Sequence, residues 1–337
     1  MVARKTYPIS KEQSLMLKGI AILLMLIHHA FTFPEWIVVG YTPNPAFAHY
    51  LNSPTKLCVG IFAFITGWAV ALDAELTIKK TGKKILKLLF TYWIVCILVM
   101  MIAVGVCGYR PTILNVAGEF AGINRTLMVF CWYVPFYIES MLLLCISQKA
   151  YDRNIALGVV TGIVLPKVVF MLLARSFSGT LLEEQFANLR HWYPCIAVGY
   201  LCNRYNIFSY CRDLTKKIPK TLLLIAGMSF CAIGRYFSTT FDLIYCAVLV
   251  FSIADYMNQC KSENKIGGML IALGKHSLNM WLIHCVYFTP ITREVFQPFI
   301  YWPRNGLLVC IVFVIELTVM SAIVNRVKIL LLRFFSR

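Results

Sequence analysis

Two adjacent histidines, His28 and His29, lie within an apolar run long enough to cross a membrane. An ionisable group inside such a span is costly to bury, so each one is a candidate for function. An imidazole can take a proton from a hydroxyl and return it, or it can carry an acyl group. Neighbouring helical residues point about 100° apart. We therefore expect one histidine to do the chemistry and the other to support it.

Further ionisable residues fall in other apolar runs, namely Glu139, Lys167, His284 and Glu316. A rise of 1.5 Å per residue places His29, Glu139, His284 and Glu316 about 12 to 16 Å from the inner ends of their spans, in one layer. Glu139 could bond the ring nitrogen that faces away from substrate, as the third member of a catalytic triad does. The alternative is a set of hydrogen bonds that only hold helices together. We expect Glu139, His284 and Glu316 to face the interior, with at least one of them within reach of His28 or His29.

The elements that position these residues are membrane helices. The 337 residues are 59% hydrophobic and 14% charged, with a mean hydropathy of +0.72. This composition predicts an all-α, polytopic membrane helix bundle of about ten transmembrane helices, forming a single domain over residues 1–337. It excludes singly anchored soluble enzymes, DNA-binding modules and secreted disulfide scaffolds. The predicted spans lie near 14–33, 57–73, 85–107, 126–147, 155–174, 191–203, 221–236, 241–257, 270–289 and 305–326.

The basic residues indicate an orientation. With the N-terminus in the cytoplasm, the predicted inner segments hold 23 Lys and Arg residues and the outer segments hold eight. The first run is expected to be a retained span rather than a cleaved signal peptide. The longest outer loop, 34–56, contains four prolines that should exclude a helix interior. Most of the 13 cysteines lie in apolar runs and are expected to act as small hydrophobic residues.

Four segments resemble a known family, the acyltransferase 3 family of bacterial membrane O-acyltransferases. The run from Lys18 to His29 is similar to that family's opening helix, where a basic residue precedes the essential histidine. The stretch Gly60–Trp68, which contains Thr66, is similar to an F-x-S-G segment. Cys131–Val134 resembles L-W-Y/F-L, and Leu273–His284 resembles the closing L-G-K-x-S-L and L-x-H pattern. Lys18 stands where the family usually has Arg, which removes a bidentate guanidinium, and Thr66 stands in place of Ser.

The resemblance implies transfer of an acyl group, with acetyl-CoA the expected donor, to a hydroxyl of a surface glycan or its lipid-linked precursor. It selects His29 for catalysis, and the residues themselves add His28 as its neighbour and Glu139 as a candidate partner. Substrate contacts are expected at Lys18, Thr66, Trp132, Tyr133, His284 and Glu316, although the two aromatics would also fit the belt of aromatic residues at a membrane interface. The basic inner face could hold the coenzyme A phosphates at Lys79, Lys83, Lys84 and Lys275, although the rule that places lysines on the inner side explains them equally well. The cluster of Arg212, Lys216 and Lys217 is an alternative phosphate site.

The expected setting is the bacterial inner membrane with both termini cytoplasmic, and with acyl-CoA, a glycan or lipid-linked sugar, and membrane lipid as partners. Neither a metal nor nucleic acid is expected. The alternative function is a secondary transporter or lipid-glycan flippase, in which the same polar layer relays protons. A glycan polymerase is disfavoured because no large outer loop is present.

Overall fold

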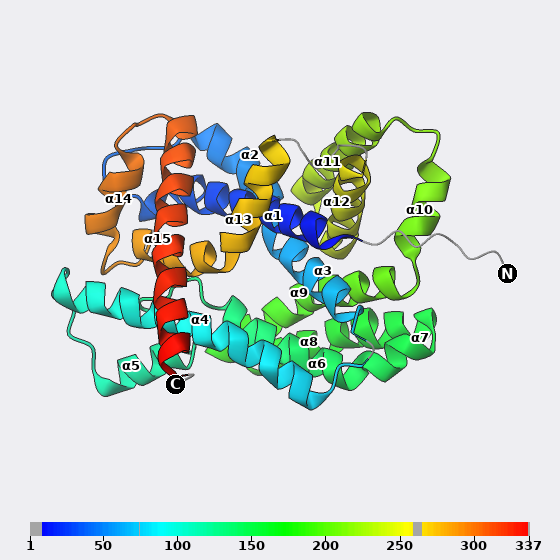
Figure 1. The fold of residues 1–337 in the computed structure, drawn as a ribbon, viewed down its shortest axis with the longest axis horizontal. Helices are drawn as coiled ribbons and strands as arrows, with labels where there is room; N and C mark the ends of the chain where they lie inside the picture. Colours follow the sequence, from blue (N-terminus) through cyan, green and yellow to red (C-terminus); the bar gives the residue numbers. More distant parts are fainter. Residues whose placement is uncertain (1–8, 74, 259–264, 336–337) are drawn as a thin grey trace. The chain divides into compact units, whose positions relative to one another are not determined.

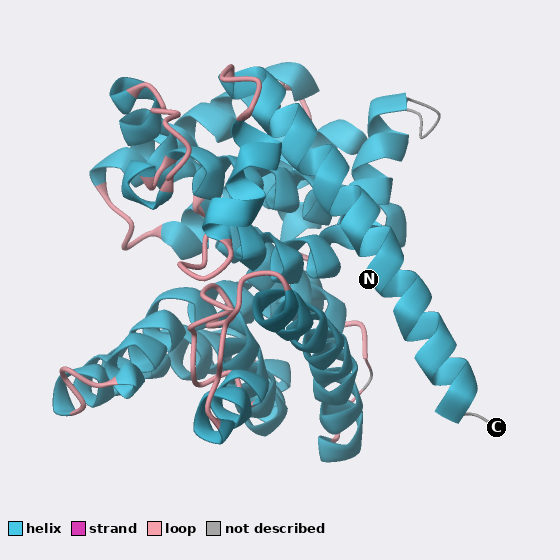
Figure 2. Ribbon diagram, turned by 90° about the vertical axis from the view of Figure 1, so that its left-hand side faces the viewer, coloured by secondary structure: helices cyan, strands magenta, loops and turns pink. Residues whose placement is uncertain are grey.

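The computed structural model describes residues 9–73, 75–258 and 265–335, and in these ranges the regular structure is helical, with no strand (Figures 1 and 2). The α-helices are α1 (Lys11–Phe31), α2 (Pro45–Thr55), α3 (Leu57–Val70), α4 (Ile78–Gly105), α5 (Ile113–Phe120), α6 (Tyr133–Arg153), α7 (Ile155–Val159), α8 (Leu165–Ser176), α9 (Leu181–Arg204), α10 (Ile207–Thr215), α11 (Lys220–Phe237), α12 (Asp242–Met257), α13 (Lys265–Ile283), α14 (Arg293–Tyr301) and α15 (Gly306–Phe335). Three short elements join them, the 3-10 turns η1 (Pro34–Trp36) and η3 (His284–Tyr287) and the π-helical turn η2 (Val160–Val164).

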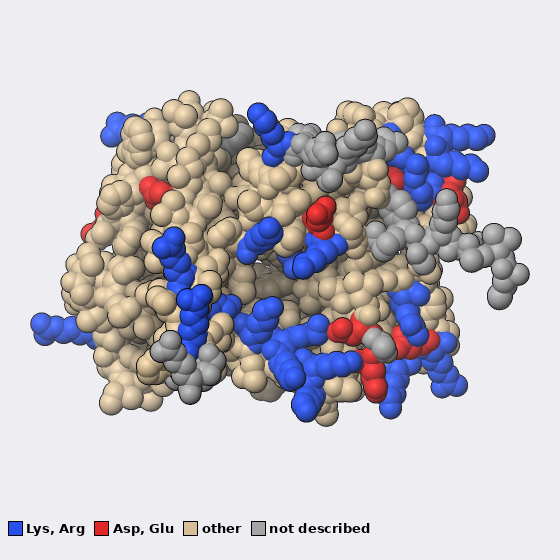
Figure 3. All heavy atoms as spheres, in the orientation of Figure 1, with Lys and Arg blue, Asp and Glu red and all other residues tan. Residues whose placement is uncertain are grey.

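Among the described residues, six helices are long and apolar enough to cross a membrane. They cover Lys11–Phe31, Ala48–Val70, Ile78–Gly105, Ile155–Ser176, Lys220–Phe237 and Gly306–Phe334. The face drawn in Figure 3 shows more basic than acidic side chains, with broad areas that carry neither. The fold is therefore that of an all-helical membrane protein, while the number of spans, expected to be ten, stays a prediction.

Several sequence-based boundaries differ from the structure. Residues 126–132 precede α6 as turns, so the span expected to start at 126 begins as a helix only at Tyr133. The segment 191–203 is part of the 24-residue helix α9. The segment 34–56 contains α2 despite its prolines, because Pro45 occupies the first helical position and Pro54 the last turn. A proline at a helix start sacrifices no hydrogen bond, since that N–H has no partner within the helix.

The chain forms two compact units, and neither is continuous in sequence. Unit 1 comprises Met1–Ala21, Ser53–Thr81 and Glu139–Gly274. Its centre is the contact of α3 with α9, where two glycines let the backbones approach. A Cβ on Gly67 would lie 1.9 Å from the carbonyl oxygen of Ile196, and one on Gly199 would lie 2.1 Å from that of Phe64. Small residues of this kind are the usual means of close packing between membrane helices.

Unit 2 comprises Ile22–Asn52, Gly82–Ile138 and Lys275–Arg337. Polar contacts join its helices in pairs. In α13, Nδ1 of His276 lies 2.8 Å from Oγ of Ser321 in α15. Lys328 of α15 donates to Oγ1 of Thr91 in α4, at 2.6 Å. The segments of unit 2 that lie far apart in sequence are thereby fixed against one another, and they carry the histidines.

Candidate active site

His28 and His29 occupy the last turn of α1. The helix ends at Phe31, where Thr32 turns its hydroxyl back onto the carbonyl oxygen of His28 at 2.6 Å, and Pro34 follows in η1. The two imidazole rings meet edge to face, with centroids 5.1 Å apart and planes 77° apart. His28 is buried and His29 is half-buried. The end of α1 thus presents two imidazoles in different directions, as the helical geometry requires.

The ring of His284 lies beside that of His29. Their centroids are 4.9 Å apart, although α1 and η3 stand at opposite ends of the sequence. His284 is the first residue of η3 and is 0% exposed. Its Nδ1 donates to the carbonyl oxygen of Trp281 one turn earlier. This bond fixes the tautomer and leaves Nε2 with a lone pair. Within the described part of the chain, that buried Nε2 has no hydrogen-bond partner.

Aromatic rings enclose His29. Phe130 lies closest, 3.9 Å away between centroids, and it stacks on His284 at 4.8 Å with planes only 10° apart. Phe33 and Phe288 follow at 5.7 and 6.1 Å. We call His29, His284, Phe33, Phe130 and Phe288 the histidine cage. Its apolar walls leave His284 0% exposed while His29 stays half-buried, and electrostatic interactions beside such walls are stronger than in water.

A row of further rings borders the cage. Trp36 of η1 stacks on Phe33 at 4.7 Å and on Phe130 at 5.4 Å. The predicted substrate residue Tyr133 packs edge-on against Trp281, whose carbonyl group holds His284. Trp132 in turn contacts Tyr133, at 5.9 Å. Both predicted aromatics therefore belong to the surroundings of His284.

Glu316 is also near this region of unit 2. Its Oε2 accepts a hydrogen bond of 2.7 Å from the hydroxyl of Tyr287, the last residue of η3. Of the four predicted members of the polar layer, His29, His284 and Glu316 therefore belong to unit 2, and Glu139 belongs to unit 1.

Glu119 shapes the loop that carries Phe130, and the sequence analysis did not single it out. The side chain is 0% exposed. Its Oε1 accepts from the backbone N–H groups of Thr126 (2.7 Å) and Leu127 (2.8 Å), and its Oε2 accepts from that of Met128 (3.2 Å). The chain returns to Glu119 through Gly122, which has a φ of +72°, a conformation that favours glycine.

Glu119 is a buried carboxylate held by N–H dipoles. Burial raises the pKa of Glu119, while the three N–H donors oppose that rise. A lone acidic residue shortly before a glycine turn was the only signal in the sequence, and it did not show which amides the carboxylate would meet.

Two more buried residues connect the loops around the cage. Thr289 donates from Oγ1 to the carbonyl oxygen of Thr126, at 2.6 Å. Gln297 of α14 donates to the carbonyl oxygens of Trp36 (2.7 Å) and Tyr287 (2.9 Å), and its Oε1 accepts from the N–H of Val38 (2.8 Å). Every polar atom of the Gln297 side chain is engaged, so η1, η3 and α14 are held in a fixed arrangement.

Several predicted residues belong to unit 1. Lys18 is half-buried in α1. Thr66 donates to the carbonyl oxygen of Phe62 in its own helix, at 2.8 Å. Glu139 accepts a 2.5 Å hydrogen bond from Nε2 of Gln185, a partner the sequence did not suggest. A role for Glu139 as the third member of a catalytic triad stays a prediction.

Three of the four predicted phosphate-binding lysines lie on the first turns of α4, and the fourth, Lys275, is on α13. Lys79 and Lys83 are four residues apart and therefore share a helix face, with Lys84 beside them. Lys79 and Lys83 are exposed, as is Lys275 of α13. The described residues contain no group of His, Cys, Asp and Glu suited to a metal ion, and their twelve cysteines are free.

Comparison with known proteins identifies a family that covers most of the chain. Residues 16–324 match a family model described as Acyltransferase domain. No curated protein and no solved structure matches the chain.

Proposed function

Because the chain belongs to the acyltransferase 3 family, we propose that it is a membrane O-acyltransferase which moves an acetyl group from acetyl-CoA to a hydroxyl of a surface glycan or its lipid-linked precursor. The family match supports acyl transfer in a membrane protein. The donor, the acceptor and the residues in their roles are our proposal.

The histidine cage is the observation that carries this proposal. In the reaction the acceptor oxygen bonds to the thioester carbonyl carbon, its proton passes to an imidazole nitrogen, and the C–S bond breaks. The departing coenzyme A thiolate then takes up a proton. If His29 first carries the acyl group, a bond from its ring nitrogen to the carbonyl carbon forms as the C–S bond breaks, and this C–N bond breaks when the acceptor oxygen bonds to the same carbon. A cage that limits water protects either path from hydrolysis of the acyl group.

The two histidines take complementary roles in this scheme. His29 is the general base or acyl carrier, as expected from its place in the opening helix. His284 presents the lone pair of Nε2 next to it, and that nitrogen can receive a hydroxyl proton while His29 is acylated. His28 supports His29 by edge-to-face contact.

The remaining assignments follow the same scheme. Coenzyme A phosphates would be held by Lys79, Lys83, Lys84 and Lys275, and Lys18 would neutralise a donor phosphate or a nearby carboxylate. The protein would lie in a bacterial inner membrane with both termini in the cytoplasm, where acyl-CoA is available.

The test is incubation of the purified protein with acetyl-CoA labelled in the acetyl group, in the presence of a bacterial membrane extract that supplies glycan and lipid-linked sugar. Release of coenzyme A together with label in glycan or lipid-linked sugar supports the enzyme. A protein that binds or moves lipid-linked sugar but consumes no acyl-CoA would instead be a transporter or flippase. His29→Ala protein, checked for normal expression, is the control for adventitious thioester hydrolysis.

A further inference from the structure

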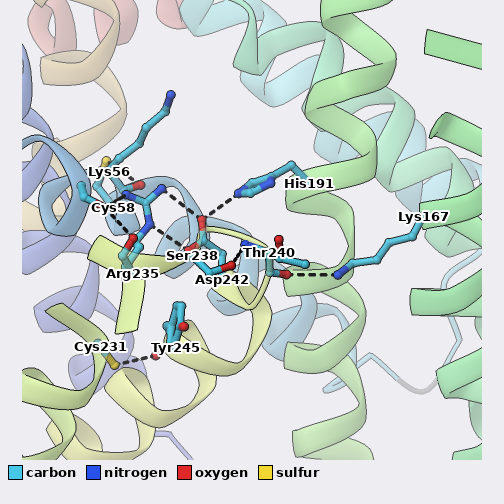
Figure 4. A network of polar contacts seen from close by, with 11 residues as sticks. Lys56, Cys58, Lys167, His191, Cys231, Arg235, Ser238, Thr240, Asp242 and Tyr245 are labelled. Carbon is cyan, nitrogen blue, oxygen red and sulfur yellow. Dashed lines mark hydrogen bonds and ion pairs between the residues drawn. The ribbon is translucent and has the colours of Figure 1, made fainter. Parts of the chain in front are cut away.

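The two helices α11 and α12 of unit 1 are joined by buried ion pairs at both of their ends. At one end, the carboxylate of Asp242 accepts two hydrogen bonds from the guanidinium of Arg235, at 2.8 and 3.1 Å (Figure 4). At the other end, Asp255 is 1% exposed. It pairs with two cations, Nζ of Lys220 at 2.5 Å and Nε of Arg212 at 3.0 Å. This second end therefore holds one more cation than a single carboxylate can neutralise.

The two cations differ in burial. The side chain of Lys220 is 2% exposed, and a charge so far from water needs its carboxylate in direct contact. The side chain of Arg212 is 30% exposed and thus extends from Asp255 to the surface. Its Nη1 has no hydrogen-bond partner among the described residues, and in the same ranges Arg212 pairs with no second carboxylate. Because Lys220 already neutralises Asp255, the charge of Arg212 has no counter-ion of its own.

Arg212 belongs to a row of side chains along one face of α10. Phe208, four residues earlier, is buried, and its ring centroid lies 5.2 Å from that of Phe251 in α12. Lys216, four residues later, is exposed and keeps helical backbone angles at the end of α10. Asp213 points about 100° away around the helix. Since residues four apart on a helix are neighbours, the surface end of the row presents the cations of Arg212 and Lys216 side by side.

This row lies next to the start of a membrane helix. α11 is one of the helices long and apolar enough to cross a membrane, and Lys220 is its first residue. Only residues 216–219 separate it from α10. Leu222 and Ile225, in the first two turns of α11, are exposed. In a bilayer, the start of such a helix is at the level of the lipid phosphates, and its exposed apolar side chains face the acyl chains.

The chemistry of the two cations selects a class of ligand. A guanidinium and an ammonium donate hydrogen bonds and accept none, so the ligand must supply oxygen lone pairs, and the unmatched charge requires an anion. The phosphate of an anionic phospholipid meets both conditions. In phosphatidylcholine the head group carries its own cation, which would leave the charge of the site uncompensated. A soluble phosphate compound would pair with the cations but leave the exposed face of α11 uncovered.

We propose that Arg212 and Lys216 bind the head-group phosphate of an anionic phospholipid, whose acyl chains lie along the exposed face of α11. Asp255 is the positioning residue, because it holds the guanidinium of Arg212, while Lys220 neutralises the carboxylate. Basic sites next to membrane helices recognise anionic lipids in this way. All of these residues belong to unit 1. The site goes beyond the proposed function and requires nothing of the chemistry at the histidine cage.

The test measures lipid binding by the full chain in detergent. Phosphatidylglycerol and phosphatidylcholine with the same acyl chains are added at equal concentrations, and bound lipid is counted by native mass spectrometry. Arg212→Gln removes the exposed charge and leaves the Lys220–Asp255 pair in place. Lys216→Gln removes the second charge, which lies outside the buried ion pairs. Lys149→Gln, at an exposed lysine of α6 in the same unit, is the matched control for net charge.

We expect the wild type to prefer phosphatidylglycerol. This preference should fall about fivefold or more in Arg212→Gln and in Lys216→Gln, the contribution of one basic residue near a membrane surface, and Lys149→Gln should keep it. If Arg212 only stabilised Asp255, Arg212→Gln would unfold at a lower temperature with its lipid preference intact.

That result overturns the site, as does an unchanged preference in Lys216→Gln, which decides the matter if Arg212→Gln fails to fold. A second arm adds coenzyme A or glycerol phosphate to the protein with phosphatidylglycerol bound. Neither should displace the lipid. Displacement by either compound at a concentration equal to that of the lipid would identify a soluble phosphate ligand and overturn the lipid site.

Discussion

At the scale of single residues, a substitution of His29 at the end of α1 tests the proposed mechanism most directly. His29, rather than His28, touches both Phe130 and His284. We predict that His29→Ala lowers acyl transfer by about 10²-fold or more, the effect of losing a general base, with normal expression and insertion. His28→Ala should have a smaller effect. Transfer of labelled acetyl to glycan in membranes measures both. Loss of activity in His28→Ala alone would reverse the assignment.

His284 can be tested by separating its two nitrogens. Asparagine can keep the donor toward the carbonyl oxygen of Trp281 but lacks Nε2. If Nε2 takes the acceptor proton, His284→Asn should reduce transfer by about 10²-fold, the general-base magnitude. A purely structural histidine would tolerate the change. His49→Asn, at an exposed histidine of α2, serves as the control, and the loss should appear in kcat rather than in KM for acetyl-CoA.

Glu119 acts on the cage through the loop that carries Phe130. Glu119→Ala leaves three buried N–H groups without their acceptor, at a cost of about 1 to 3 kcal/mol for each group left unsatisfied. We expect strongly reduced activity and a lower temperature of unfolding. Glu119→Gln keeps one oxygen acceptor and should fall between Glu119→Ala and wild type. An alanine variant with wild-type activity and melting behaviour would show that the loop needs no carboxylate.

The sequence indicated the members of the site more readily than their partners. His29 and His284 could be selected because a titratable group in an apolar run is conspicuous. That Phe130 would contact both rings could not be predicted, since one phenylalanine among 23 carries no distinguishing signal. Glu139 was conspicuous for the same reason as the histidines, yet its hydrogen bond goes to Gln185, because local geometry and not charge alone selects a partner.

At the scale of elements, hydropathy located helices well and their ends poorly. The apolar run of α4 continues into a lysine-rich first turn that a hydropathy window excludes, and α9 begins well before the apolar part of its sequence. Polar residues can extend a helix beyond the membrane, since only its central part must be apolar. The break before Tyr133 was hidden because residues 126–132 are themselves apolar.

The α3–α9 contact supplies a prediction about packing. In Gly199→Ala the new Cβ would meet the backbone of Phe64 at 2.1 Å. We expect a loss of about 1 to 3 kcal/mol from overpacking, seen as a lower unfolding temperature in detergent. Gly82→Ala in α4 is the matched control, because no atom lies within 4 Å of its added Cβ. Its unfolding temperature should not fall, since alanine is the better helix former. Equal melting of the two variants would contradict close packing at Gly199.

At the scale of the whole molecule, the distribution of positive charge predicts orientation independently of the family. With 23 basic residues on the predicted inner segments and eight on the outer ones, both termini should be cytoplasmic. A reporter protein that works only in the cytoplasm should therefore be active when it is fused after Arg337. Activity of a periplasm-specific reporter at the same position would show that the orientation is the opposite one. The lysines of α4 would then face the periplasm and could not bind cytoplasmic acyl-CoA.

The discontinuity of unit 2 has a consequence for biogenesis. His29 leaves the ribosome early, but His284, η3 and α15 come from its final segment, Lys275–Arg337. Contacts so distant in sequence form late, because the residues between them must first be synthesised and the loop between them closed. During synthesis the end of α1 is therefore made before the residues that later cover its imidazoles. A nascent chain stalled before residue 275 would hold every residue of the opening helix and still lack the wall that His284 and Phe288 provide.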